Sequence, residues 1–173
     1  MAYITFRGGT KEQKKLAKSL AEFCLNKLIS SRLSNTLDIR IVFKPTLYKK
    51  TESYGETTYY EDSNVPPKDF LIEIDSKLKM RSMLETIAHE LVHVKQWATG
   101  EMRETKDNFI TKFKKDTINS NKVSYWDQPW EIEAYGLENS LVAKFLIEHN
   151  QFKNLRQKQE NWFVYEEDNV LDE

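Results

Sequence analysis

The sequence predicts an α+β domain in which a small, mainly antiparallel sheet packs against an N-terminal helix and two longer helices. Short apolar segments with a two-residue period, typical of half-buried strands, alternate with longer segments whose apolar residues recur at helical spacing. The 173 residues have the length of one ordinary domain, and we find no internal repeat. We therefore expect a single domain over residues 1–165, followed by an acidic, disordered tail at 166–173.

The first part of the chain is expected to supply two strands and a helix. Residues 3–6 fit a short strand, and residues 37–43 alternate between apolar and polar side chains as a half-buried strand does. Between them, Thr10 is followed by Gln13 at the spacing of a capping box, which marks the start of a helix. Apolar residues then recur at helical spacing to about Ser30, so this helix should pack one face on the core.

The middle of the chain leads into the helix of greatest interest. Residues 47–68 are polar and rich in tyrosine, which indicates a loop or irregular hairpin with a short strand at 57–60. Residues 70–75 form the strongest strand candidate. A helix is then expected over residues 77–99, which contain neither proline nor glycine, and Gly100 is a natural C-terminal stop.

The last part is expected to be helical. Residues 102–118 are rich in lysine, with apolar residues assignable to one side of a helix, and residues 119–128 form a loop. Pro129 marks the start of a helix over residues 130–149. A final amphipathic stretch at 151–164 should pack on the outside of the domain.

Composition narrows the possible setting and partners. A net charge of −1 gives no general attraction to nucleic acid or to a membrane surface, so we expect neither as a partner. Cys24 is the one cysteine, which excludes an internal disulfide and fits a reducing cytoplasm. We find no signal-peptide core and no apolar run of membrane-spanning length, so the predicted location is the cytoplasm.

The most specific chemical signal is the pentapeptide of residues 89–93, which has the pattern H-E-x-x-H. On a helix, His89 and His93 lie one turn apart on the same face, so both imidazoles can bind one metal ion. Glu90 is placed to act as a general base on water that the metal ion activates. The surrounding residues make the helix apolar on most sides, so the two imidazoles are expected to be buried. Buried polar groups need bonding partners, and a metal ion would supply one. We therefore predict a zinc site, although other divalent ions can use the same ligands.

A catalytic zinc site usually has three protein ligands, so a third is needed. Cys24 belongs to the apolar face of a separate helix, and His149 comes at the far end of a later one. Glu131 and Glu133, in the first turn of the helix after Pro129, are the better candidates. They differ by about 200° around a helix, so one of them can face the metal and the other cannot.

The residues H-E-L-V-H-V-K-Q, followed about 40 positions later by P-W-E-I-E-A-Y, resemble the gluzincin metallopeptidases. The resemblance is greatest to small, minimal zincins of the SprT-like and phage-encoded kind. It implies a zincin-like fold and, for a viral protein, a location in the host cytoplasm. In that clan the third ligand is a glutamate, commonly followed at the third position by a small residue. Ala134 in that position favours Glu131, and Glu133, followed by Gly136, is the second choice.

The resemblance also implies roles around the metal. The clan often places an acidic residue four positions beyond the ligand, where this chain has Tyr135. In such enzymes a tyrosine or histidine often assists the oxyanion that develops on the substrate carbonyl. The candidates here are Tyr125, Tyr135 and the tyrosines within 54–60, and we select Tyr135. A peptide substrate would pair with the strand at 70–75 if that strand borders the cleft; an internal strand is the alternative.

The expected function is therefore hydrolysis of peptide bonds in a protein or peptide substrate. Three alternatives remain at this point. The site could be catalytically weak or inactive and serve an interaction module, or the reaction could be hydrolysis of another amide or an ester. A nucleic-acid-associated protease would need a zinc ribbon or basic extension, which we do not find in the sequence, and would bind DNA in a salt-sensitive way.

Overall fold

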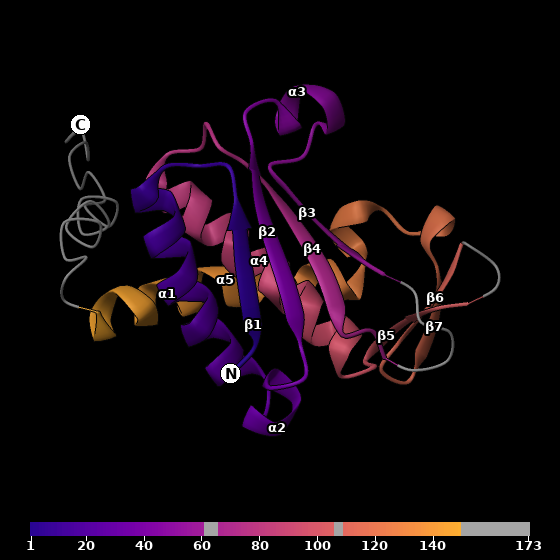
Figure 1. The fold of residues 1–173 in the computed structure, drawn as a ribbon. Helices are drawn as coiled ribbons and strands as arrows, with labels where there is room; N and C mark the ends of the chain where they lie inside the picture. Colours follow the sequence, from indigo (N-terminus) through magenta and orange to yellow (C-terminus); the bar gives the residue numbers. More distant parts are fainter. Residues whose placement is uncertain (61–65, 106–108, 150–173) are drawn as a thin grey trace, which may run out of the picture.

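The computed structural model describes residues 1–60, 66–105 and 109–149 (Figure 1). The amphipathic stretch expected at 151–164 and the tail expected at 166–173 lie outside these residues. The described part is α+β, as predicted, with helices packed against a small sheet and a second sheet to one side.

The main sheet is mixed rather than mainly antiparallel. Its strands are β1 (Tyr3–Arg7), β2 (Asp38–Lys44), β4 (Asp69–Asp75) and β3 (Gly55–Tyr59), in that spatial order. The β1–β2 and β2–β4 pairs are parallel, and the β3–β4 pair is antiparallel. The prediction was wrong here because the helix between β1 and β2 returns the chain to the same end of the sheet, which makes these strands parallel.

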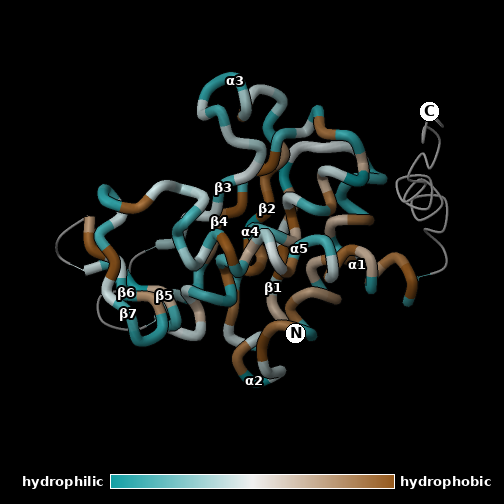
Figure 2. The backbone as a smooth tube through the Cα atoms, turned by 180° about the vertical axis from the view of Figure 1, so that it is seen from behind, coloured by the Kyte–Doolittle hydropathy of each residue, from teal (hydrophilic) through white to brown (hydrophobic). Residues whose placement is uncertain are grey.

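Three long helices lie together on one face of this sheet: α1 (Lys11–Leu28), α4 (Met80–Ala98) and α5 (Pro129–Glu148) (Figure 1). In β2, Ile39, Ile41 and Phe43 point into this layer and are buried, while Arg40 between them is exposed. Figure 2 shows hydrophobic residues concentrated where sheet and helices meet. The core therefore lies between the sheet and the helices, with α4 at its centre.

The ends of α1 and α4 follow the predicted signals. Thr10 caps α1, and its side chain and that of Gln13 form the reciprocal hydrogen bonds of a capping box. Gly100, which follows the C-cap residue of α4, adopts a left-handed conformation with φ of 74°, which glycine accepts without strain. Two shorter helices, α2 (Ser31–Ser34) and α3 (Leu47–Thr51), connect the other elements.

The segment predicted as a helix over residues 102–118 is instead a three-stranded antiparallel sheet. It contains β5 (Met102–Glu104), β6 (Ile110–Phe113) and β7 (Asp116–Asn119). Thr111 and Phe113 in β6 are buried, and Lys112 between them is exposed, so the true period is two. Lys114, at a positive φ of 54°, makes the tight turn into β7. Apolar residues at 109, 110 and 113 have helical spacing, whereas one of the two buried positions of β6 is the polar Thr111, so the sequence pattern favoured a helix.

Two short 3₁₀ turns, η1 (Ser120–Lys122) and η2 (Tyr125–Asp127), lead from this second sheet into α5. No helix in the described ranges combines the length and apolar character needed to cross a membrane.

Candidate metal centre

The two histidines of the pentapeptide lie on one face of α4, as their spacing predicts. His89 and Glu90 are buried, at 7% and 5% exposure. The Nε2 atoms of His89 and His93 are 3.1 Å apart, and the two rings meet edge to face. Residues of α4 around them, such as Leu91 and Val92, are fully buried in the core. The helix that carries the imidazoles is therefore held on several sides.

Glu131, in the first turn of α5, completes a group of three donors. Its Oε2 lies 3.3 Å from Nε2 of His89, and its Oε1 lies 3.5 Å from Nε2 of His93. One donor atom from each residue lies within 4.8 Å of the others, and all three residues are buried. The structure thus brings together the predicted residues His89, His93 and Glu131, and this group could bind a metal ion.

Glu133, the alternative ligand, faces away from the group. Its carboxylate accepts hydrogen bonds from Nε2 of Gln96 at 2.8 Å and from Lys95 and Lys114 at 3.2 and 2.9 Å. These donors, with burial opposing them, lower the pKa of Glu133. The angle between successive positions on α5 therefore separates the two glutamates as expected, with Glu131 on the side of the histidines.

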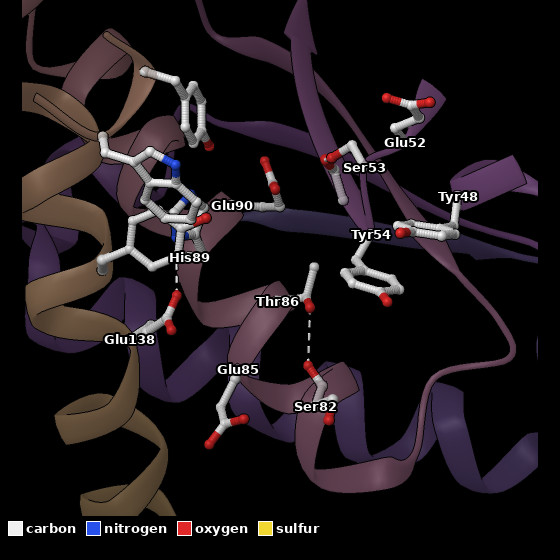
Figure 3. Close-up of a pocket in the computed structure, with 14 residues that line it drawn as sticks. Tyr48, Glu52, Ser53, Tyr54, Ser82, Glu85, Thr86, His89, Glu90 and Glu138 are labelled. Carbon is white, nitrogen blue, oxygen red and sulfur yellow. Dashed lines mark hydrogen bonds and ion pairs between the residues drawn. The ribbon is translucent and has the colours of Figure 1, made fainter. Parts of the chain in front are cut away.

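The opposite nitrogen of each imidazole is already bonded. Nδ1 of His89 donates to Oε2 of Glu138 at 2.9 Å (Figure 3), and Nδ1 of His93 donates to Oε1 of Gln96 at 2.8 Å. These bonds occupy Nδ1 of both rings, so each Nε2 faces Glu131 and, once it has lost its proton, can offer its lone pair to a metal ion. Two imidazole nitrogens and one carboxylate oxygen, oriented in this way, fit a zinc ion well.

Gln96 is itself held firmly. It is fully buried, and its Nε2 donates to the carbonyl of Trp130 at 2.9 Å as well as to Glu133. Both donations fix which way the amide points, so its oxygen remains aimed at His93. Glu133 therefore acts on the site indirectly, through Gln96.

The charges of the group are strongly coupled. Burial opposes protonation of His89, but hydrogen bonds to Glu131 and Glu138 raise its pKa to about 9. Burial likewise opposes ionisation of Glu131, but hydrogen bonds from His89 and His93 lower its pKa to about 2. The anionic carboxylate of Glu131 thus stabilises positive charge on the imidazoles beside it. A metal cation bound between these groups would replace the protons on the imidazoles.

Glu90 lies beside this group, against the edge strand β3. The hydroxyl of Thr57 donates to Oε2 of Glu90 at 2.7 Å. A Cβ added at Gly55 would lie 2.7 Å from Oε1 of Glu90 and 2.5 Å from Thr86, so a residue without a side chain is required there. Burial raises the pKa of the Glu90 carboxyl, and the nearby histidine and threonine oppose that effect. A raised pKa suits a carboxylate that must take up a proton near neutral pH.

Two of the candidate tyrosines reach the group in different ways. The hydroxyl of Tyr125 donates to Oε2 of Glu131 at 2.7 Å. The ring of Tyr135 lies edge to face on His89, with ring centroids 4.5 Å apart. Tyr135 therefore contacts a ligand candidate through its ring, whereas Tyr125 bonds to one through its oxygen.

A cavity of about 610 Å³ opens beside the candidate centre (Figure 3). One wall comes from α3 and the segment leading into β3, the floor from α4, and the other wall from η2 and α5. Its lining residues are Tyr48, Glu52, Ser53, Tyr54, Gly55, Ser82, Glu85, Thr86, His89, Glu90, Tyr125, Trp126, Tyr135 and Glu138. Among the three donor residues, His89 lines this cavity, so the cavity meets the candidate centre at that residue.

The strand predicted at residues 70–75 is β4, and it is an internal strand of the sheet, which was the alternative to a strand at the border of the cleft. It pairs with β2 on one side and β3 on the other, so it cannot receive an added strand, and β3 is the strand that borders the cavity.

Cys24 is buried in the core, and burial raises the pKa of its thiol. His149 packs against Phe145 and Phe23 at the end of α5. Neither belongs to the candidate centre.

Sequence reasoning missed Glu138, Gln96 and Thr57. Glu138 follows Glu131 by seven residues, two helical turns, and Gln96 follows His93 by three, so both share a helix face with a ligand. That spacing could have indicated them. Thr57 comes from a strand whose position depends on tertiary structure, and nothing in the local sequence signals its contact.

In comparisons with known proteins, no family model, no curated protein and no solved structure matches this chain. The arrangement of His89, His93, Glu131 and Glu90 is therefore the feature that points to a function.

Proposed function

We propose that this chain is a zinc-dependent metallopeptidase of the gluzincin type, with a minimal zincin-like domain. The observation that carries the proposal is the adjacency of two features at one cavity. A buried group of three donors, His89, His93 and Glu131, has the composition of a catalytic zinc site. The carboxylate of Glu90 lies next to this group and also lines the cavity.

Zinc bound by these residues would polarise the scissile carbonyl and lower the pKa of a water molecule to about 7. With such an ion bound, the carboxylate of Glu90, whose Oε2 accepts a hydrogen bond from Thr57, would take up the proton of the water molecule. The same carboxyl then delivers the proton to the leaving amine nitrogen. Tyr135 remains a candidate for assisting the oxyanion, and Tyr125 is a second one.

The substrate backbone would pair with β3. Its partner β4 occupies one edge of this strand, and Gly55 at the start of the strand lines the cavity that contains Glu90. An extended peptide added there would place its carbonyl groups near the candidate centre. Gly55 permits this close approach of strand and helix α4.

A structural zinc site is the less favoured alternative. Structural zinc is usually enclosed by four protein ligands. In the described residues, the donor group contains three, and the cavity lies beside it. This arrangement favours a centre at which a small molecule can bind.

The first test is the metal content of the purified protein, measured by elemental mass spectrometry without added metal. We expect one zinc per chain, and we expect the His93→Ala variant to lose it. Absence of metal from the wild type, with a melting temperature that a chelator does not change, would contradict the proposal.

The second test separates metal binding from turnover. Glu90→Gln should keep the fold and the zinc but reduce hydrolysis of a synthetic peptide mixture by roughly 10²- to 10⁴-fold, the usual contribution of a general base. Glu104→Gln, a charge change on the exposed surface of β5, is the matched control and should cleave as the wild type does. Equal turnover in Glu90→Gln and the wild type would exclude Glu90 as the base.

A further inference from the structure

The cavity extends past Glu90 to a pair of stacked tyrosines. The rings of Tyr48 and Tyr54 are 4.4 Å apart between centroids and nearly parallel, at 11°. Both side chains line the cavity and remain about half exposed, at 45% and 49%. In Figure 3 they lie across the cavity from His89. Large aromatic rings that stay exposed inside a cavity are available to bind a ligand.

The buried side chain of Asp75 holds this pair in place. Its Oδ2 accepts a hydrogen bond from the backbone N–H of Tyr48 at 3.0 Å, and its own N–H donates to the carbonyl of Tyr54 at 2.9 Å. Its Oδ1 accepts from the N–H of Lys77. The two tyrosines come from separate elements, α3 and the segment before β3, so a single buried residue fixes their relative position.

The charge of the cavity has one sign. Apart from His89, the charged side chains that line it are the carboxylates of Glu52, Glu85, Glu90 and Glu138. Arg81 neutralises Glu85 through an ion pair of 2.6 Å. A bound zinc ion with its ligand Glu131 would add one net positive charge, and the remaining carboxylates still leave the cavity negative.

Glu52 lies at the same end of the cavity as the tyrosines (Figure 3). It ends α3, with its N–H bonded to the carbonyl of Tyr48 at 2.8 Å. Lys49 and Lys50 of the same helix are exposed and do not line the cavity. An aromatic platform beside a carboxylate is the chemistry that binds a cation.

We infer that Tyr48, Tyr54 and Glu52 form a subsite for a basic side chain of the peptide substrate, with arginine preferred. This inference rests on the proposed peptidase function and names its substrate class. A planar guanidinium can stack on the exposed face of a tyrosine and bond to a carboxylate at once. Lysine offers a compact charge without a planar face, so it should bind less well than arginine but better than leucine or glutamate.

The test is a scan of alanine-based decapeptides that carry one arginine, lysine, leucine or glutamate at each position in turn. At one position relative to the cleaved bond, we expect arginine to raise kcat/KM about tenfold over leucine, with lysine between them, the combined size of an exposed cation–π contact and an exposed ion pair. Glu52→Gln should reduce this preference about threefold, and added salt should weaken it. Glu104→Gln is the matched control and should leave it unchanged.

Tyrosine variants test the platform. Tyr54→Ala should remove most of the arginine preference, and Tyr54→Phe, which keeps the ring, should retain it. Circular dichroism and the melting temperature check that Tyr54→Ala folds. If Tyr54→Ala fails to fold, a normal preference in Glu52→Gln at low salt would still overturn the assignment.

Binding is measured separately, so that the subsite and the peptidase proposal can fail independently. Fluorescence polarisation with the Glu90→Gln variant compares labelled arginine and glutamate decapeptides. Selective arginine binding without any cleavage by the wild type would support the subsite and refute the peptidase. Cleavage without an arginine preference would refute the subsite alone. Neither cleavage nor selective binding would refute both.

Discussion

Two sides of α5 near its start carry a glutamate each, and the two glutamates differ in what surrounds them. Glu131 faces the imidazoles of His89 and His93, and the hydroxyl of Tyr125 adds one more donor. Glu133 faces Lys95, Gln96 and Lys114. The first glutamate is placed to bind a metal ion, and the second keeps the residue that orients a ligand in position. Position around the helix, not residue type, decides which role each has.

The largest effect is expected for Glu131→Ala. Removal of a ligand should lower zinc affinity by more than the roughly 10- to 100-fold typical of residues that only orient ligands. Competition with a chromogenic chelator measures the affinity. If Glu133→Ala lowers it more than Glu131→Ala does, the two roles are reversed.

Glu138→Gln should come next. Glu138 shares the face of α5 with Glu131 and fixes the tautomer of His89, so we expect a loss of up to about 100-fold in zinc affinity. Glu148→Gln on the same helix breaks one exposed ion pair with Lys27 and serves as control, with no change expected. Equal affinities in the two variants would mean that Glu138 does not orient His89.

Gln96→Met should cost about tenfold in zinc affinity. The side chain keeps its size but no longer accepts the hydrogen bond from Nδ1 of His93. Nitrogen-15 spectra of the imidazoles report the tautomers directly. We expect the His93 signal to change and the His89 signal to stay, and a change in His89 alone would contradict this assignment.

The smallest effect is expected for Glu133→Ala, with a loss of zinc affinity below about tenfold. Gln96 would keep its bond to the carbonyl of Trp130, so its orientation should survive in part. Lys114 is half exposed, so its ion pair with Glu133 should add little to the free energy of unfolding, up to about 1 kcal/mol. Combining this change with Gln96→Met tests the indirect route, because the two losses should not add.

The sequence predicted the parts of the site that depend on local periodicity. The spacing within α4 predicted that His89 and His93 share a face, and the start of α5 at Pro129 predicted a choice between two glutamates. It could not predict which strand borders the cavity, because the pairing of β4 between β2 and β3 depends on contacts far apart in the chain. Residues 102–118 show the same limit, since their apolar residues fit a helix until the turn at Lys114 is known.

The position of α4 links the stability of the fold to the retention of a metal ion at the candidate centre. The helix that carries His89 and His93 is also the centre of the hydrophobic core, so the ligands cannot separate without disturbing it. Local fluctuations that open loops should leave the histidine pair intact, because the least protected amides of a protein lie outside its core. Heating should therefore release a bound metal in the same cooperative step in which the domain melts.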